Sequence, residues 1–189
     1  MTLLRPLICA LALAALPAWA APVAYSLQPD KSTVGFETDF GQDHISGQMP
    51  ITRAELTIDF KAVNQSTIAV TLDASGAKAN FPFAAEAMKA ASVLDTAAYP
   101  NITFQSTSVR KTENGARVEG NLTLRGVTQK VVLMAVISRQ KGTDASDLRH
   151  LSIRLTGALK RSAFGANGWN DMVADEVRLD ILARIAQVN

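Results

Sequence analysis

Side chains of the types that carry catalysis or bind metal ions are few in this sequence, and they stand in no familiar arrangement. Two histidines are present, His44 and His150, and neither belongs to an H-E-x-x-H or C-x-x-C motif. The G-x-S-x-G motif that surrounds the nucleophile of α/β-hydrolases is absent from the sequence. Asp171 and Asp175 are near enough in sequence to form a carboxylate pair for acid–base chemistry, although loop polarity explains them equally well. We therefore predict no catalytic residue, no metal site and no cofactor.

A glycine-rich segment carries side chains that would suit a polar headgroup. Residues 165–169 read Gly-Ala-Asn-Gly-Trp, and Lys160, Arg161 and Asn170 flank them. A cation there would pair with a phosphate, and the indole of Trp169 would stack on an aromatic ring. Solvated loops often carry the same residue types, so that alternative stays open. On this basis Lys160, Arg161 and Asn170 are the headgroup candidates.

Most of the sequence alternates between apolar and polar residues, as strands with one buried face do. The alternating segments are residues 34–40, 55–60, 68–72, 117–125, 151–156 and 176–185. Residues 130–137 are apolar on both faces, so we expect a strand there whose outer side is covered as well. A further strand is expected at residues 102–109.

One segment departs from this alternation. Residues 83–94 are rich in alanine and follow Pro82, with Met88, Ala91 and Leu94 at helical spacing. This pattern predicts a helix of about two to three turns.

The expected strands must close or pair face to face to hide their apolar side. A barrel of about eight strands has room inside for side chains or one small ligand. Residues 21–189 contain one tryptophan and two tyrosines, too few for the aromatic girdles of an outer-membrane barrel. We therefore predict an all-β fold, a single antiparallel β-barrel of about eight strands, with the apolar face inside and a short helix covering part of it.

The first 20 residues have the features of a secretory signal peptide. Arg5 precedes the apolar run of residues 7–16, and Ala18 and Ala20 are the small residues expected before a cleavage site. An uncleaved membrane anchor is the alternative, but this run is shorter than the about 18 residues that span a bilayer. We expect residues 1–20 to be removed and residues 21–189 to form one exported domain. That domain contains no cysteine and hence no disulfide.

Composition and charge limit the kinds of partner. Charged residues make up 19% and apolar residues 48% of the chain, which supports a folded core and excludes a disordered chain. The formal net charge of +2 is too small to predict nucleic-acid binding. Basic residues are in excess in the second half of the chain, which is compatible with transient contact with an anionic membrane surface. The sequence leaves open whether the protein forms a homodimer.

Two motifs resemble the YceI-like, polyisoprenoid-binding family. Residues 94–106, LDTAAYPNITFQS, resemble the family pattern (L)-D-x-x-x-(Y/F)-P-x-(I/A)-x-F-x-S. Residues 120–128, GNLTLRGVT, are similar to its G-x-L-T-(I/L)-x-G-V-T hairpin. Weaker similarities lie in an opening strand at residues 25–36, a turn at 162–165 and a closing strand at 175–177. The resemblance covers essentially all of the expected exported domain.

This resemblance implies a lipocalin-like, extended antiparallel barrel with an apolar lumen. It implies an exported, periplasmic protein that carries or stores a long isoprenoid or similar amphiphilic lipid, with isoprenoid quinones among the ligands. Some members of the family are linked to stress responses of the cell envelope. The implied partner is the lipid itself, and no other cofactor is implied.

A long isoprenoid tail needs an apolar lining because each CH₂ group left in water costs about 0.8 kcal/mol. We expect that lining to consist of large apolar residues that point inward. They are Phe36, Phe40, Phe60, Phe81, Phe83, Met88, Phe104, Leu122, Phe164 and Trp169. Two alternatives remain open. The same residues would fill the core of an envelope interaction module, with no cavity and an exposed apolar patch, or the barrel would be the pocket of an enzyme.

Overall fold

The computed structural model describes residues 22–144 and 146–188, and the predicted signal peptide at residues 1–20 lies outside the described residues. The strands are β1 (Val23–Leu27), β2 (Thr33–Phe40), β3 (Asp43–Met49), β4 (Ile51–Ile58), β5 (Thr67–Asp73), β6 (Lys78–Ala79), β7 (Asn101–Thr112), β8 (Gly115–Leu124), β9 (Val127–Arg139), β10 (His150–Lys160) and β11 (Glu176–Gln187). The helical segments are α1 (Pro82–Lys89) and the short 3-10 turns η1 (Pro29–Lys31), η2 (Val63–Gln65) and η3 (Arg161–Phe164). Within the described ranges, no helix is long and apolar enough to cross a membrane.

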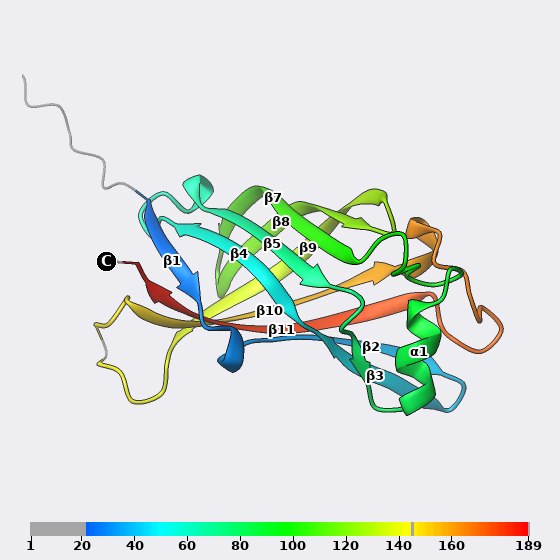
Figure 1. The fold of residues 1–189 in the computed structure, drawn as a ribbon. Helices are drawn as coiled ribbons and strands as arrows, with labels where there is room; N and C mark the ends of the chain where they lie inside the picture. Colours follow the sequence, from blue (N-terminus) through cyan, green and yellow to red (C-terminus); the bar gives the residue numbers. More distant parts are fainter. Residues whose placement is uncertain (1–21, 145, 189) are drawn as a thin grey trace, which may run out of the picture.

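Eight of the strands close into an antiparallel barrel (Figure 1). Their order is β1-β4-β5-β7-β8-β9-β10-β11, and β11 returns to β1 through the pairs Tyr25–Gln187 and Leu27–Ile185. The first half of β11 pairs instead with β2, and β3 and β6 continue the sheet from there. The predicted all-β barrel of about eight strands is confirmed, and its sheet extends beyond the closed ring.

The connections between strands gather at the two ends of this barrel. One end, called the turn end below, holds residues 59–66, the tight turn at 113–114, and the β9–β10 connection. The opposite end, the helix end, holds residues 74–100, which include α1, and residues 161–175. Figure 1 shows α1 at one extreme of the barrel and the C-terminus at the other.

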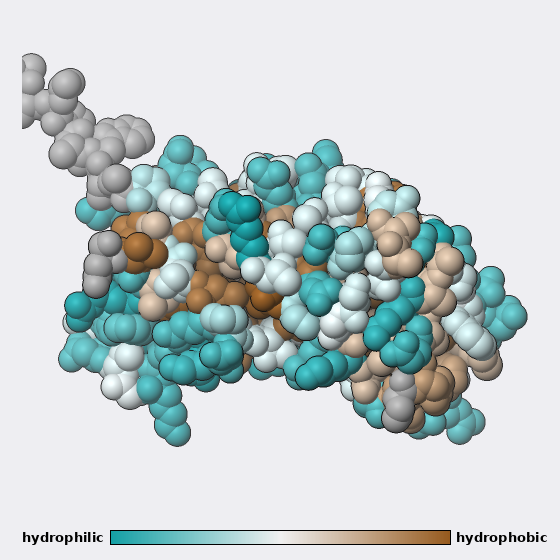
Figure 2. Space-filling view, viewed as in Figure 1, coloured by the Kyte–Doolittle hydropathy of each residue, from teal (hydrophilic) through white to brown (hydrophobic). Residues whose placement is uncertain are grey.

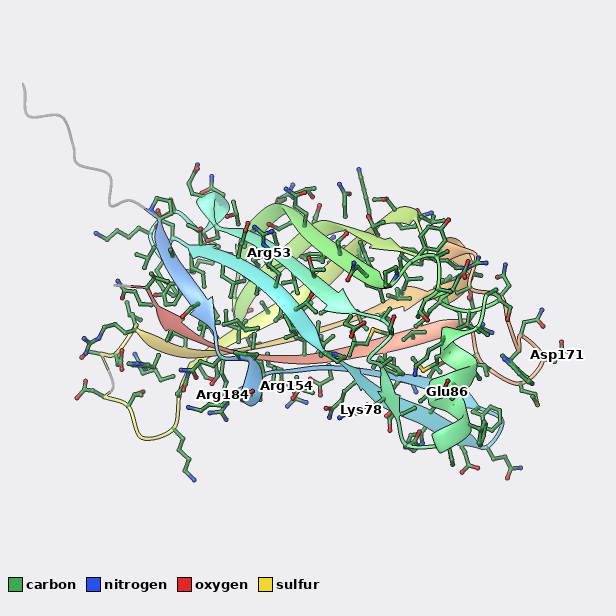
Figure 3. All side chains as sticks on the ribbon, in the orientation of Figure 1. Arg53, Lys78, Glu86, Arg154, Asp171 and Arg184 are labelled. Carbon is green, nitrogen blue, oxygen red and sulfur yellow. The ribbon has the colours of Figure 1, made fainter. Side chains whose placement is uncertain are left out.

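Most charged side chains lie on the outside of the barrel. Arg53, Lys78 and Arg154, labelled in Figure 3, are all exposed, and Arg154 pairs with Asp180 on the neighbouring strand. Along β8, by contrast, every second residue from Ala116 is buried. The alternation in the sequence therefore separates a wet outer face from a dry inner one, as predicted.

β9 is a strand, but its outer side is not covered. Val131, Leu133 and Ala135 face inward and are buried, whereas Met134 is 42% exposed and Val136 53% exposed. The prediction of an outer cover over this strand is wrong, because no described element packs against that face.

Helix α1 is shorter than the predicted helix over residues 83–94. It ends at Lys89, and Ala90 has left helical geometry with a ψ of 154°. Leu94 donates its N–H to the carbonyl oxygen of Met88 at 2.9 Å and is buried in the same apolar cluster that Met88 packs against. Met88 and Leu94 therefore face the same apolar cluster, as their spacing predicts, but a turn after Lys89 brings Leu94 there instead of a continuous helix.

Candidate functional site: an apolar cavity along the barrel

The barrel encloses a cavity of about 680 Å³. Residues from all eight barrel strands line it, together with β2, β3, α1 and the segment between η3 and β11. The polar side chains of the lining are those of Thr38, Asp59, Ser66, Lys111, Asn114 and Arg161. On the face seen in Figure 2, apolar side chains are visible in a hollow bordered by hydrophilic ones.

A cavity of this volume is large enough for a small-molecule ligand. The alternative of a barrel whose core is filled by its own side chains is therefore wrong. The reason is that the inward positions include many small residues, among them Ala54, Ala87, Ala116, Ala135 and Ala183.

Most of the predicted lining residues border the cavity. They are Phe36, Phe40, Phe60, Phe83, Met88, Phe104, Leu122 and Trp169. Phe81 and Phe164 do not. The ring of Phe81 packs against those of Phe40 and Phe83, with centroids 6.5 and 5.8 Å apart. The turn η3 directs Phe164, which is only 1% exposed, into a packed cluster with Leu124. Contact of the lining with a ligand stays a prediction.

At the helix end, the lining reaches the surface through apolar side chains. Phe83 is 61% exposed, Trp169 55% and Met172 48%. Trp169 has a left-handed backbone with a φ of 61°, and its carbonyl oxygen accepts the N–H groups of Met172 and Val173. A bulky residue rarely adopts this conformation because it is energetically unfavourable. The two hydrogen bonds of the turn stabilise it and keep the indole at the mouth of the cavity. We call these three side chains, Phe83, Trp169 and Met172, the apolar rim.

The three headgroup candidates lie at this same end, but the structure does not present them to the cavity as a group. Lys160 and Asn170 are exposed and do not border the cavity. Arg161 borders it and is buried. Its guanidinium donates to four backbone carbonyls, those of Ala166, Gly168, Val173 and Ala174, at 2.6–2.9 Å. Because the guanidinium already donates to these loop carbonyls, it is not free to bind a headgroup, which argues against that role for Arg161.

The carboxylates and histidines singled out in the sequence have other partners. Asp175 accepts hydrogen bonds from the backbone N–H of Ser162 at 2.8 Å and from its hydroxyl at 2.9 Å, and these bonds lower the pKa of Asp175. Asp171 is exposed at the helix end (Figure 3). His150 lies 3.0 Å from Asp147 through Nδ1, and neither His44 nor His150 borders the cavity. Within the described ranges, no group of three His, Cys, Asp or Glu residues is placed to hold a metal ion.

The turn end contains polar lining residues that the sequence analysis did not single out. Lys111 pairs across β7 and β8 with Ala116, which is buried and faces the cavity, so Lys111 occupies an inward position. Asn114 follows in the β7–β8 turn. Asp59 is buried, and its Oδ1 accepts the N–H groups of Lys61 and Ala62 at 2.8 Å each. The available signal was the position of Lys111 two residues after the inward Val109, at the end of its strand.

Comparison with known proteins agrees with this architecture. Residues 25–185 match the family described as the YceI-like domain. Protein YceI of Salmonella arizonae is 30% identical over 125 residues, which is 66% of this chain and 65% of the length of that relative. The match thus spans slightly less than two thirds of the curated relative.

Solved structures share the fold. The crystal structure of BcnA from Burkholderia cenocepacia superposes with a TM-score of 0.75 and 19% identity, covering 84% of this chain and 99% of that one. A polyisoprenoid binding domain from Saccharophagus degradans gives a TM-score of 0.59 and 12% identity, covering 88% and 99% of the two chains. The barrel, its helix and the family match over residues 25–185 lead to one conclusion: this chain belongs to the YceI-like family.

Proposed function

We propose that this protein is an exported carrier or store for a long-chain isoprenoid or similar amphiphilic lipid, which it holds in the barrel cavity. The observation that carries the proposal is the closed barrel around an apolar space of about 680 Å³. Burial of about ten CH₂ groups there would contribute about 8 kcal/mol before the costs of association are subtracted. A gain of that size needs no directional contact, so it suits a featureless hydrocarbon tail.

The relationship to known proteins supports the same ligand class. The domain from Saccharophagus degradans that shares this fold is described as polyisoprenoid binding. Isoprenoid quinones belong to this class, because their tails are of the same chemical kind. The further link to envelope stress rests on the family resemblance alone.

We place this function in the periplasm, on the basis of the signal-peptide features of residues 1–20. The apolar rim at the helix end supports transient contact with a membrane, since exposed apolar side chains of this kind often mark such sites. A lipid would then pass between the bilayer and the cavity without crossing water.

Binding is favoured over catalysis by the composition of the lining. Within the described residues it includes no histidine, and its one carboxylate, Asp59, is engaged with two backbone N–H groups. This lining supports ligand binding as the proposed role rather than catalysis.

Native mass spectrometry of the protein purified from its host, followed by organic extraction, tests the proposal. We expect one isoprenoid or related lipid of definite mass per protein molecule. A protein that is free of ligand, and that gains no mass on incubation with polyprenyl lipids and quinones, would overturn it.

A further inference from the structure

The charges on the cavity lining are distributed unevenly between its two ends. Among the described lining residues, only Asp59, Lys111 and Arg161 carry charge. Arg161 lies at the helix end, and its guanidinium is occupied by four backbone carbonyls. Asp59 follows β4 and Lys111 is near the end of β7, so both lie at the turn end, where β7 also contacts η2. The turn end is therefore the polar end of the cavity.

Lys111 is the cation there that is available to a ligand. Its inward position next to Ala116 places the side chain at the border of the cavity, while its exposure keeps the ammonium group in contact with water. No ion pair or side-chain hydrogen bond joins Lys111 to any other described residue. Asn114 adds an amide to the same border.

The opposite end would receive a polar group poorly. Its lining is formed by the apolar side chains of residues such as Phe40, Phe83 and Met88. Two exposed carboxylates, Glu86 and Asp171, lie around the helix end (Figure 3). Glu86 is paired with Lys89 at 2.9 Å and Lys160 is exposed at the same end, so it is the apolar lining that favours the tail at this end.

Asp59 limits the charge that the polar end accepts. It is buried at the same border as Lys111, and its carboxylate is held in place by the N–H groups of Lys61 and Ala62. One ammonium and one carboxylate at the same end of the cavity suit an acceptor oxygen with little charge and disfavour a phosphate or diphosphate, which carries two or more negative charges.

We propose that the ligand lies in the cavity in one orientation, with its polar end at Lys111 and Asn114 and its tail toward α1. The polar end is an oxygen acceptor with at most a single negative charge, such as a carboxylate or a carbonyl. This assignment rests on the proposed function and adds to it the direction of the ligand and the chemical class of its polar end.

The orientation is tested with Trp169, which lies at the helix end. Residues 21–189, the expected exported domain, contain Trp169 as their one tryptophan, so its fluorescence reports on the helix end. Two C16 fatty acids are compared as probes, one brominated next to the carboxylate and one brominated near the terminal methyl group. We expect the methyl-end bromine to quench Trp169 more strongly. Stronger quenching by the carboxylate-end bromine would overturn the proposed orientation.

The polar end is tested with Lys111→Met. We expect hexadecanoic acid to bind about tenfold more weakly, as the loss of a charge-assisted hydrogen bond predicts, and 1-hexadecanol to change less than about threefold. Lys111→Arg keeps the charge and should retain the binding of the acid. Lys61→Met is the matched control, because Lys61 is exposed at the same end and does not border the cavity. Equal losses in Lys111→Met and Lys61→Met would overturn the role of Lys111.

Asp59→Asn tests the limit on charge, since an asparagine Oδ1 can still accept the two backbone N–H groups. We expect hexadecyl phosphate to bind at least about threefold more tightly to this variant, and hexadecanoic acid to gain less. An unchanged affinity for the phosphate would overturn that part of the proposal. If the unmodified protein bound neither these probes nor polyprenyl lipids and quinones, the proposed function itself would fail, a result distinct from binding in the reverse orientation.

Discussion

Arg161 holds the loop between β10 and β11 together from inside. The side chain is buried, and the backbone carbonyls that it reaches belong to residues 166–174, the segment that carries Trp169. A loop has little apolar packing of its own to hold its shape. Here the planar guanidinium of Arg161 does this through hydrogen bonds to the loop's backbone carbonyls. The hydrogen bonds of Arg161 therefore fix the shape of the loop that forms the mouth of the cavity at the helix end.

Arg161→Lys should lower the free energy of unfolding by about 2–4 kcal/mol. The lysine keeps the charge but cannot reach four carbonyls with a planar fork, and it leaves buried acceptors without donors. Chemical denaturation measures the loss. Lys160→Ala, at the exposed neighbour, should change stability by less than about 0.5 kcal/mol. If the two variants were equally stable, Arg161 would not be the organiser of this loop.

Asp175 gives this same loop a pH dependence. The backbone N–H of Ser162, then its hydroxyl, stabilise the carboxylate and lower the pKa of Asp175 from its usual 3.8. A lowered pKa in the folded state contributes stability above pH 3.8 that is lost as the pH falls through the lower folded value. Asp175→Asn should therefore lower the Tm at neutral pH, and the difference from the unmodified protein should shrink below about pH 4. A difference that stayed constant across this range would contradict the assignment.

Pairs of glycine and phenylalanine shape the strands. A Cβ atom on Gly120 of β8 would lie 2.4 Å from the ring of Phe104 on β7, and one on Gly47 of β3 would lie 2.3 Å from the ring of Phe36 on β2. In both cases a ring carbon of the phenylalanine lies where a side chain of the neighbouring strand would otherwise begin. Both rings border the cavity, so the two glycines set where the aromatic lining lies.

Gly120→Ala should destabilise the protein by about 1–3 kcal/mol, because the ring of Phe104 and the backbone carbonyl oxygen of Gln105, 2.6 Å from the added Cβ, must both shift to admit the methyl group. Thermal unfolding monitored by circular dichroism measures the effect. Asn121→Ala serves as the control, since it changes the next residue of the same strand on its exposed face. A Gly120→Ala variant as stable as Asn121→Ala would show that the ring and the carbonyl group adapt freely.

The cavity is a property of the whole molecule, because every barrel strand contributes to its lining. An interior at ordinary packing density has few voids larger than a water molecule. Here the inward alanines leave a continuous space, so the protein forgoes some packing within its own core. A bound tail would restore those contacts and stabilise the folded state in proportion to its concentration.

Ala135→Phe tests whether the lumen is open. Ala135 pairs with Ala116 on β8 and therefore lies toward the turn end. Ala135 is buried and faces the cavity, so the new ring should enter empty space, lower stability by less than about 1 kcal/mol and greatly reduce the capacity for a long-chain lipid. Ala74→Phe is the matched control, because Ala74 is equally buried but does not border the cavity. That variant should lose about 1–3 kcal/mol by overpacking. Equal destabilisation by both, with lipid binding intact, would argue against an open lumen.

The alternation of apolar and polar residues determined the fold class at the scale of the strands. It did so because a side-chain period of two assigns each residue to one face of a sheet. Residues 94–106 and 120–128 also sufficed to identify the family. The same local patterns failed where neighbours in space decide the outcome, as at the uncovered outer face of β9 and at the early end of α1.

Only the tertiary structure decided whether the barrel is hollow and which end of it is polar. The volume left inside depends on the sum of side chains from all strands, and no single segment specifies that sum. Arg161 was predicted to meet a headgroup, but its hydrogen-bond partners lie in a loop whose path the sequence does not reveal. In the sequence, Lys111 has no feature that separates it from a surface lysine. Only its pairing with Ala116 in the structure shows that it borders the cavity. Spacing along a chain sets which face a residue takes, whereas the partners of a charged group depend on distances in space.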